Sequence, residues 1–196
     1  MNLTELTAPP PAAIPVRDFA DHLRLGSGFA DEGAEDALLE AYLRAAIAAI
    51  EARTGKVLLE REFNWDLTRW FAPDRQGLPV GPVNEVTALA LFARDGTEVA
   101  VDPASFTLRR DLFRPELVAA ALPAIPYGGL VRIQFRAGFG PGWSDVPADL
   151  AQAVMMLAAE NYEARSDRHG AGASMPFGVL ALIERYKTVR LLGDVL

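Results

Sequence analysis

The chain has 196 residues, a formal net charge of −7, 51% hydrophobic and 23% charged residues, and no cysteine. This length and composition are typical of one globular domain, or of one domain with a large insertion, and the missing cysteines exclude disulfides and zinc–thiolate sites. No apolar run approaches the ~20 residues that span a bilayer, and the N-terminal stretch lacks a secretory signal pattern, so we expect a cytoplasmic product without membrane contact.

The charge is unevenly distributed along the chain. Residues 165–196 contain five Lys or Arg and three acidic residues, a net charge of +2, so the remainder carries −9. An acidic body is a poor non-specific DNA binder, because neutralising phosphates requires clustered cations. The weakly basic tail is suited to binding an acidic protein partner, or it is simply solvated.

Helical spacing dominates the N-terminal third, after a proline-rich stretch, 1–13, that we expect to be flexible. Apolar residues at helical intervals predict a helix within 14–25, and 34–55 gives the clearest helix signal in the chain. Its main apolar stripe consists of Leu39, Leu43, Ile47 and Ile50, widened by Leu38 and Tyr42. Gly55 supplies a C-terminal stop, and the many alanines permit close approach of a helix from the same chain or from a second copy.

The hydrophobic period changes from about 3.6 to 2 in 57–137, which predicts a mostly antiparallel β unit. Strand-like runs occupy 57–67, 84–93, 97–101, 105–110 and 130–137. Asp95-Gly96 predicts a hairpin between the second and third runs.

The helical period returns in 147–165, and we expect this helix to pack on the helices that precede the β unit. The sequence therefore predicts an α+β fold with a helical core (14–56 and 138–165) and an inserted β unit (57–137). A linker, 166–174, then leads to a C-terminal segment, 175–196.

Several catalytic or ligand-binding motifs are nearly present, but each lacks an essential residue. Residues 53–56 resemble the end of a P-loop without its first glycine or its final Ser or Thr. Residues 138–142 lack the third glycine of a dinucleotide fingerprint, and Gly142-Trp143-Ser144 lacks the closing glycine of a nucleophile elbow. His22 and His169 have no neighbours at metal-ligand spacing. We therefore expect no catalytic residue, no metal and no cofactor.

The C-terminal segment contains an amphipathic helix pattern over 175–192. Its apolar stripe consists of Val179, Leu182, Ile183, Tyr186 and Val189, with Phe177 just before it, and its charged residues lie mostly on the other side. Two interpretations remain open. The stripe inserts into a groove of another molecule, or it folds back onto the helical core of its own chain.

Six stretches, in this order, resemble the head–tail connector proteins of long-tailed bacteriophages, also called adaptors or head-completion proteins, which occur in gene transfer agents too. They are DHLRL (21–25), DALLEAYLRAAIAAIEARTGKVL (36–58), EFNWDL (62–67), VRIQFRAGFG (131–140), VPADLAQAVMMLAAENYEAR (146–165) and PFGVLALIERYKTVRL (176–191). The resemblance covers nearly the whole chain and is loosest in 100–128.

The resemblance implies a structural protein of a virion or phage-like particle, without enzymatic activity, that is assembled in the bacterial cytoplasm. About twelve copies would form a ring beneath the portal protein and extend the DNA channel, without sequence-specific DNA binding. The ring would also dock a stopper or another tail-side neck protein, and the capsid is a further candidate partner.

Taken with this resemblance, the apolar stripe of 175–192 and the alanine-rich helix of 34–55 give two candidate surfaces. The portal-binding set would be Phe177, Val179, Leu182, Ile183, Tyr186, Lys187, Val189 and Arg190. The ring interface would include Leu38, Tyr42, Ala45 and Ala49.

Two other functions remain open. The chain could be a small α+β enzyme or ligand-binding domain with its site in loops 70–80 or 110–128. It could also be another neck ring, such as a stopper or tail terminator, although those proteins tend to be mainly β. Within the β unit, Trp65, Trp70 and Phe71 form either a contact surface or buried sheet core.

Overall fold

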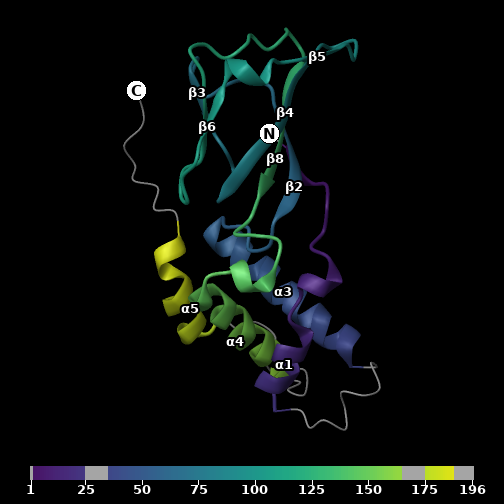
Figure 1. The fold of residues 1–196 in the computed structure, drawn as a ribbon, viewed down its shortest axis with the longest axis vertical. Coiled ribbons are helices and arrows are strands. Elements are labelled where there is room, and N and C mark those ends of the chain that lie inside the picture. Colours follow the sequence, from purple (N-terminus) through teal and green to yellow (C-terminus); the bar gives the residue numbers. More distant parts are fainter. Residues whose placement is uncertain (1, 25–34, 165–174, 188–196) are drawn as a thin grey trace. The chain divides into compact units, whose positions relative to one another are not determined.

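The computed structural model describes residues 2–24, 35–164 and 175–187, and the chain forms two compact units. The β unit combines residues 1–9 with 59–141 and contains the strands, whereas the helical unit combines 10–58 with 142–196 and contains the α-helices (Figure 1). Each unit is thus built from two separate stretches of sequence. The predicted α+β class is confirmed.

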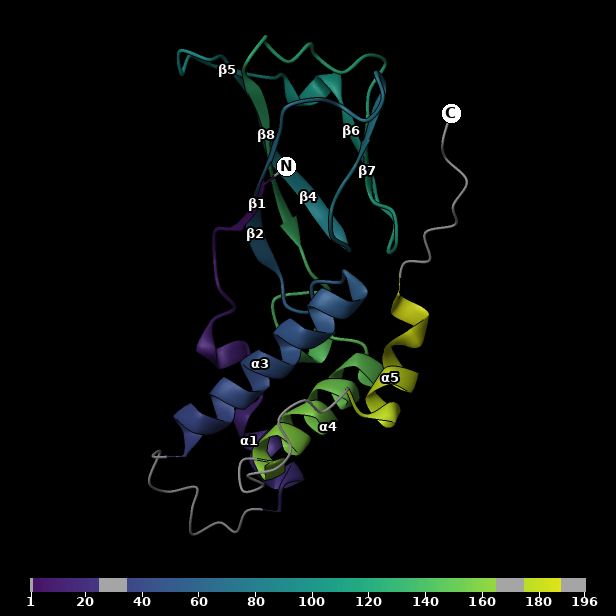
Figure 2. The same cartoon turned by 180° about the vertical axis from the view of Figure 1, so that it is seen from behind.

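The helical unit is organised around two long helices, α3 (Asp36–Thr54) and α4 (Ala148–Ala164), which pack side by side in both views (Figures 1 and 2). Two shorter helices, α1 (Val16–His22) and α5 (Phe177–Ile183), pack on α3 and α4 respectively. Short 3₁₀ turns lie at Pro11–Ala13, Trp143–Asp145 and Glu184–Tyr186. The predicted apolar stripe of α3 is buried, and α3 ends at Gly55 in the left-handed conformation, with φ 68°.

The β unit contains a five-stranded antiparallel sheet with the strand order β1-β2-β8-β4-β5. Its strands are β1 (Asn2–Glu5), β2 (Arg61–Leu67), β8 (Leu130–Ala137), β4 (Val83–Phe92) and β5 (Glu98–Ala100). A three-stranded sheet has the order β3 (Arg75–Gly77), β7 (Glu116–Val118), β6 (Thr107–Arg109), and a 3₁₀ turn at Pro103–Ser105 precedes β6.

The hairpin predicted at Asp95-Gly96 joins β4 to β5. The Ala93 N–H donates to the Thr97 carbonyl at 2.9 Å, and Gly96 has φ 87°. The Asp95 carboxylate accepts the Thr97 N–H, and this bond lowers the pKa of Asp95 below its usual value. The sequence signal therefore located this turn correctly.

The two faces of the five-stranded sheet differ in chemistry. On the inner face the apolar residues of β2 and β8 alternate into the core, and the rings of Phe63 and Phe135 stack with centroids 5.5 Å apart. The outer face carries the intervening polar residues, which stay partly exposed. This period-2 division is what the sequence pattern predicted.

Three expectations about the elements were wrong. The N-terminus, expected to be flexible, forms β1 on β2, because backbone pairing needs no apolar pattern. Strands β3 and β7 were not predicted, and the strand expected from residue 57 begins at Arg61. The helix expected over 175–192 ends at Ile183, and after one 3₁₀ turn the backbone is extended at Lys187, with ψ 132°.

Candidate interaction surfaces

The C-terminal segment packs on α4 of its own chain. Val179 and Ile183 are fully buried, and Tyr186 is only 2% exposed. The approach is close at Gly178, where a Cβ atom would lie 2.8 Å from the Met156 Cε atom. The 3₁₀ turn after Ile183 places residues three apart above one another, so Tyr186 follows Ile183 onto the same face.

A polar cluster fixes Tyr186 to the first turn of α4. Its hydroxyl donates to Asp149 Oδ1 at 2.7 Å, and Arg185 Nε lies 2.9 Å from Asp149 Oδ2. The Arg185 guanidinium also donates to the Tyr186 hydroxyl, at 2.6 Å. Burial, and then the bond to Asp149, raise the pKa of Tyr186, while the pKa of Arg185 is raised mainly by its bond to Tyr186.

The structure separates the predicted portal-binding residues into three groups. Three of them, Val179, Ile183 and Tyr186, are buried in their own chain, as in the folded-back interpretation. Phe177 is 85% exposed, whereas Leu182 and Lys187 are half-buried and Lys187 pairs with Glu184. Val189 and Arg190 lie outside the described residues. A role of this segment in binding the portal stays a prediction.

The predicted ring interface lies along α3, and most of it is on the surface. Leu38, Ala45 and Ala49 are exposed. Tyr42 is half-buried, because its ring packs edge to face on Tyr162 of α4, with centroids 5.8 Å apart and planes at 79°. Tyr42 thus helps to pack α3 on α4 and is also partly exposed at the surface.

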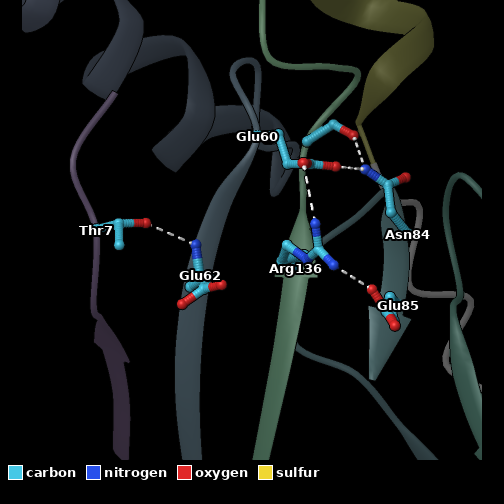
Figure 3. Close-up of polar contacts among 7 residues, drawn as sticks. Thr7, Glu60, Glu62, Asn84, Glu85 and Arg136 are labelled. Atoms are coloured by element: carbon cyan, nitrogen blue, oxygen red, sulfur yellow. Dashed lines mark hydrogen bonds and ion pairs between the residues drawn. The ribbon is translucent and has the colours of Figure 1, made fainter. Parts of the chain in front are cut away.

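A polar network that sequence reasoning missed joins β4 and β8 to Glu60, the residue just before β2 (Figure 3). Asn84 Nδ2 donates to the Glu60 carboxylate and, at 2.9 Å, to the Gly138 carbonyl. Arg136 of β8 donates to Glu85 of β4, and its guanidinium lies 4.0 Å from Glu60. A separate contact holds the N-terminal stretch, where the Glu62 N–H donates to Thr7 Oγ1 at 2.9 Å.

A second ion pair on the outer face joins the middle of the same sheet. Arg132 donates from Nε and Nη2 to the two carboxylate oxygens of Asp66, both at 2.8 Å, and this bond raises the pKa of Arg132. Its guanidinium also lies 5.0 Å from the centroid of the Phe92 ring. The sequence does contain a signal for such pairs, because β2 carries acidic residues and β8 carries arginines at every fourth position. The partners can be recognised only when the strand register is known.

The β unit also has a hollow on its surface. It has a volume of about 500 Å³, is shallow and open, and is lined by Asn84, Phe106 and Arg110 among others. Among the described residues, no group of three or more His, Asp or Glu is placed to hold a metal ion. In the same part of the chain, no helix has the length and apolar character needed to cross a bilayer.

The aromatic residues of 65–71 do not behave as one group. Trp65 is buried in the sheet core, and Trp70 donates its Nε1–H to the Pro123 carbonyl at 2.7 Å. Phe71 is 76% exposed. The core interpretation is therefore correct for Trp65, while Phe71 is available for contact.

Comparison with known proteins identifies close relatives among solved structures. No protein-family model and no curated protein matches the chain. A chain in the neck of an empty gene transfer agent (GTA) particle, computed with C6 symmetry, is 57% identical with a TM-score of 0.89. Chains in the virion of a native GTA particle and in a native GTA neck computed with C12 symmetry are 56% and 51% identical, with TM-scores of 0.87 and 0.85. Each comparison covers 99% of both chains.

These similarities settle the class of the protein. Identity above 50% over 99% of both chains goes far beyond a shared fold. The relatives are parts of the particle itself, so the chain is a structural neck component and not an enzyme. It belongs to the family of neck proteins of gene transfer agent particles.

Proposed function

We propose that the protein is the head–tail connector, or adaptor, of such a particle, and that about twelve copies form a ring below the portal. One observation carries this proposal: the chain is 51% identical, over 99% of both chains, to a chain from a neck with C12 symmetry. The ring extends the DNA channel and provides the docking surface for a stopper or another tail-side protein. The capsid is a further candidate partner.

The surface of α3 is suited to contacts between subunits of such a ring. In a cyclic ring, one surface of each subunit meets a different surface of the next. Ala45 and Ala49 have small side chains, so a neighbouring element can approach the helix backbone closely, and Leu38 adds an exposed apolar side chain. We assign these residues, with the outer edge of Tyr42, to one side of the subunit contact.

The C-terminal segment remains our candidate for portal binding, with a changed division of roles. Val179, Ile183 and Tyr186 anchor the segment on α4, so they are not available to a partner unless α5 detaches. Phe177 stands exposed at the start of α5 and is the aromatic side chain best placed to enter a portal pocket. One such contact is weak, but a dozen on one ring bind together by avidity.

The tail-side partner would dock on loops of the β unit. Phe71 follows β2, and Tyr127, which is 99% exposed, precedes β8. Leu67 at the end of β2 pairs with Val131 near the start of β8, so both loops leave the same end of the sheet. Exposed aromatic side chains are typical of binding hot spots.

Electron microscopy of the purified protein mixed with its portal tests the assignment. We expect a second ring stacked on the portal, with about twelve subunits and a central channel. A protein that stays monomeric beside bare portals, at concentrations well above those in an assembling cell, would contradict the adaptor role.

Point variants test the two docking surfaces separately. Phe177→Ser should weaken binding to the portal and leave binding of the tail-side protein unchanged. Phe71→Ser should do the opposite. Both side chains are exposed, so each variant should keep the wild-type thermal stability and serves as the control for the other. Unchanged portal binding in Phe177→Ser would remove Phe177 from the contact.

A further inference from the structure

Both edges of the five-stranded sheet are open. Within the part of the chain that the structure describes, β1 pairs with β2 alone and β5 with β4 alone. Every residue of these two edge strands is exposed. Free strand edges are templates for pairing with another chain, and natural proteins usually cover them.

The register shows which backbone groups face outward. On β1, the Leu6 N–H donates to the Glu62 carbonyl, so by alternation Thr4 and Asn2 also face β2. The N–H and C=O groups of Leu3 and Glu5 therefore point away from the sheet.

The same alternation applies to β5. The Val101 N–H donates to the Leu89 carbonyl and the Ala93 N–H to the Thr97 carbonyl, so Val99 faces β4. Glu98 and Ala100 then direct their backbone groups outward. Among the described residues, none donates to or accepts from these outward groups.

The two edges also match in side-chain chemistry. Leu3 lies opposite Trp65, and Val99 lies opposite Leu91, so both belong to the inner face of the sheet. They are 38% and 56% exposed, respectively, at the two ends of an otherwise buried face. The acidic side chains do not conflict, because Glu5 lies on the inner face and Glu98 on the outer face.

We propose that β1 of one subunit pairs with β5 of the next, so that the five-stranded sheets continue from subunit to subunit. The occupant of each edge is a second copy of this chain. This inference rests on the proposed ring, because a cyclic ring needs two different surfaces that meet, and the two edges are such a pair. Four antiparallel steps separate β1 from β5, so the two strands run in the same direction. Rotation about an axis along the strands therefore brings them together as a parallel pair.

The pairing buries the backbone groups and apolar side chains that each edge strand exposes in a single subunit. The outward groups of Leu3 and Glu5 exchange hydrogen bonds with those of Glu98 and Ala100. Leu3 comes to lie beside Val99 of the neighbour and extends the apolar inner face across the junction. Because each edge strand has only three or four residues, a single contact is weak and holds only when closure of the ring supports it.

Cysteine cross-linking tests the pairing directly, because the wild-type chain contains no cysteine. The double variant Leu3→Cys with Val99→Cys is treated, on assembled rings, with a bis-maleimide that spans about 8 Å, enough for opposite and diagonal strand neighbours. Within one subunit the two edges are four strand spacings apart, about 19 Å, so the reagent cannot join them. We expect a ladder of covalent oligomers that extends toward twelve.

Controls separate the edge contact from chance collisions. Each single variant, and the pair Leu3→Cys with Thr107→Cys on the smaller sheet, should give no ladder. Leu3→Pro removes one outward N–H and should weaken association about tenfold per contact with an unchanged circular dichroism spectrum. Rings seen by microscopy without a ladder would overturn the edge pairing and leave the adaptor role intact. If wild-type protein forms no ring on the portal, the adaptor role fails, and the edge pairing fails with it.

Discussion

The two units hold their terminal segments in opposite ways. In the β unit, the N-terminal strand β1 is attached mainly through backbone hydrogen bonds, with one ion pair from Glu5 to Arg61 at 3.3 Å, and all four of its side chains are exposed. In the helical unit, the C-terminal segment is attached through side chains, with Val179, Ile183 and Tyr186 buried. Substitution of a side chain should therefore matter little at one end of the chain and greatly at the other, whereas changes to the backbone should matter most in the β unit.

The largest effect is expected at Gly138, where the β unit depends on close backbone contact. Gly138 has φ 141°, and a Cβ atom there would lie 2.4 Å from the Glu60 Cα atom. Gly138→Ala should destabilise the β unit by about 3 kcal/mol or more, measured by urea unfolding with tryptophan fluorescence. Gly77→Ala is the matched control, because its Cβ would meet nothing within 4 Å. Equal stability of the two variants would show that the backbone at Gly138 can relax.

In the helical unit, the largest effect should come from Ile183. Its side chain is fully buried against α4, so Ile183→Ala loses apolar contact and leaves a cavity. We expect a loss of about 2–4 kcal/mol in the attachment of the segment, seen as faster amide hydrogen exchange in α5. Phe177→Ala removes a larger but exposed side chain and should leave exchange unchanged. Similar exchange in both variants would mean that the segment is held by something other than its apolar stripe.

The contrast between attachment by buried side chains and attachment by backbone hydrogen bonds also explains which elements sequence patterns could predict. The stripes of α3 and α4 and the Asp95-Gly96 hairpin were readable, because burial on one face imposes a period and the turn requires particular residues. Strand β1 left no pattern, because neither of its faces is buried.

The candidate site was predictable in part. The pattern in 175–192 identified the apolar stripe, but an i, i+3, i+4 stripe is the same whether α4 or a portal covers it. In the sequence, Asp149 is only an acid near the start of the helix predicted over 147–165. Its role as acceptor for Tyr186 depends on tertiary contact, although a buried tyrosine hydroxyl usually has a hydrogen-bond partner.

A smaller effect should appear in the N-terminal strand when the backbone alone is altered. Thr4 faces β2, so Thr4→Pro removes a hydrogen bond within the sheet and should cost about 1 kcal/mol of β1 pairing. The Asn64 amide, which faces Thr4, should then exchange about fivefold faster in the isolated chain. Leu3→Pro removes an N–H that faces outward. Amide hydrogen exchange at Asn64 in this variant should therefore match that of the wild type. Faster exchange in both variants would contradict the register from which the open edge was inferred.

An effect of similar size, at Tyr186, separates burial of the ring from bonding of its hydroxyl. Tyr186→Phe keeps the buried ring and removes the bond to Asp149, which retains the Leu150 N–H and Arg185 as partners. We expect a loss of about 1 kcal/mol at pH 7, measured by thermal unfolding.

The pH dependence of that loss identifies the hydroxyl as its cause. The folded chain raises the pKa of Tyr186, so it favours the neutral phenol. The resulting stabilisation is complete below the ordinary tyrosine pKa of about 10 and is lost as the pH rises through the higher value of the folded state. The stability difference between wild type and Tyr186→Phe should therefore be constant near neutral pH and shrink in alkali. A difference that stays constant above pH 10 would mean that the ring alone, and not its hydroxyl, holds the segment on α4.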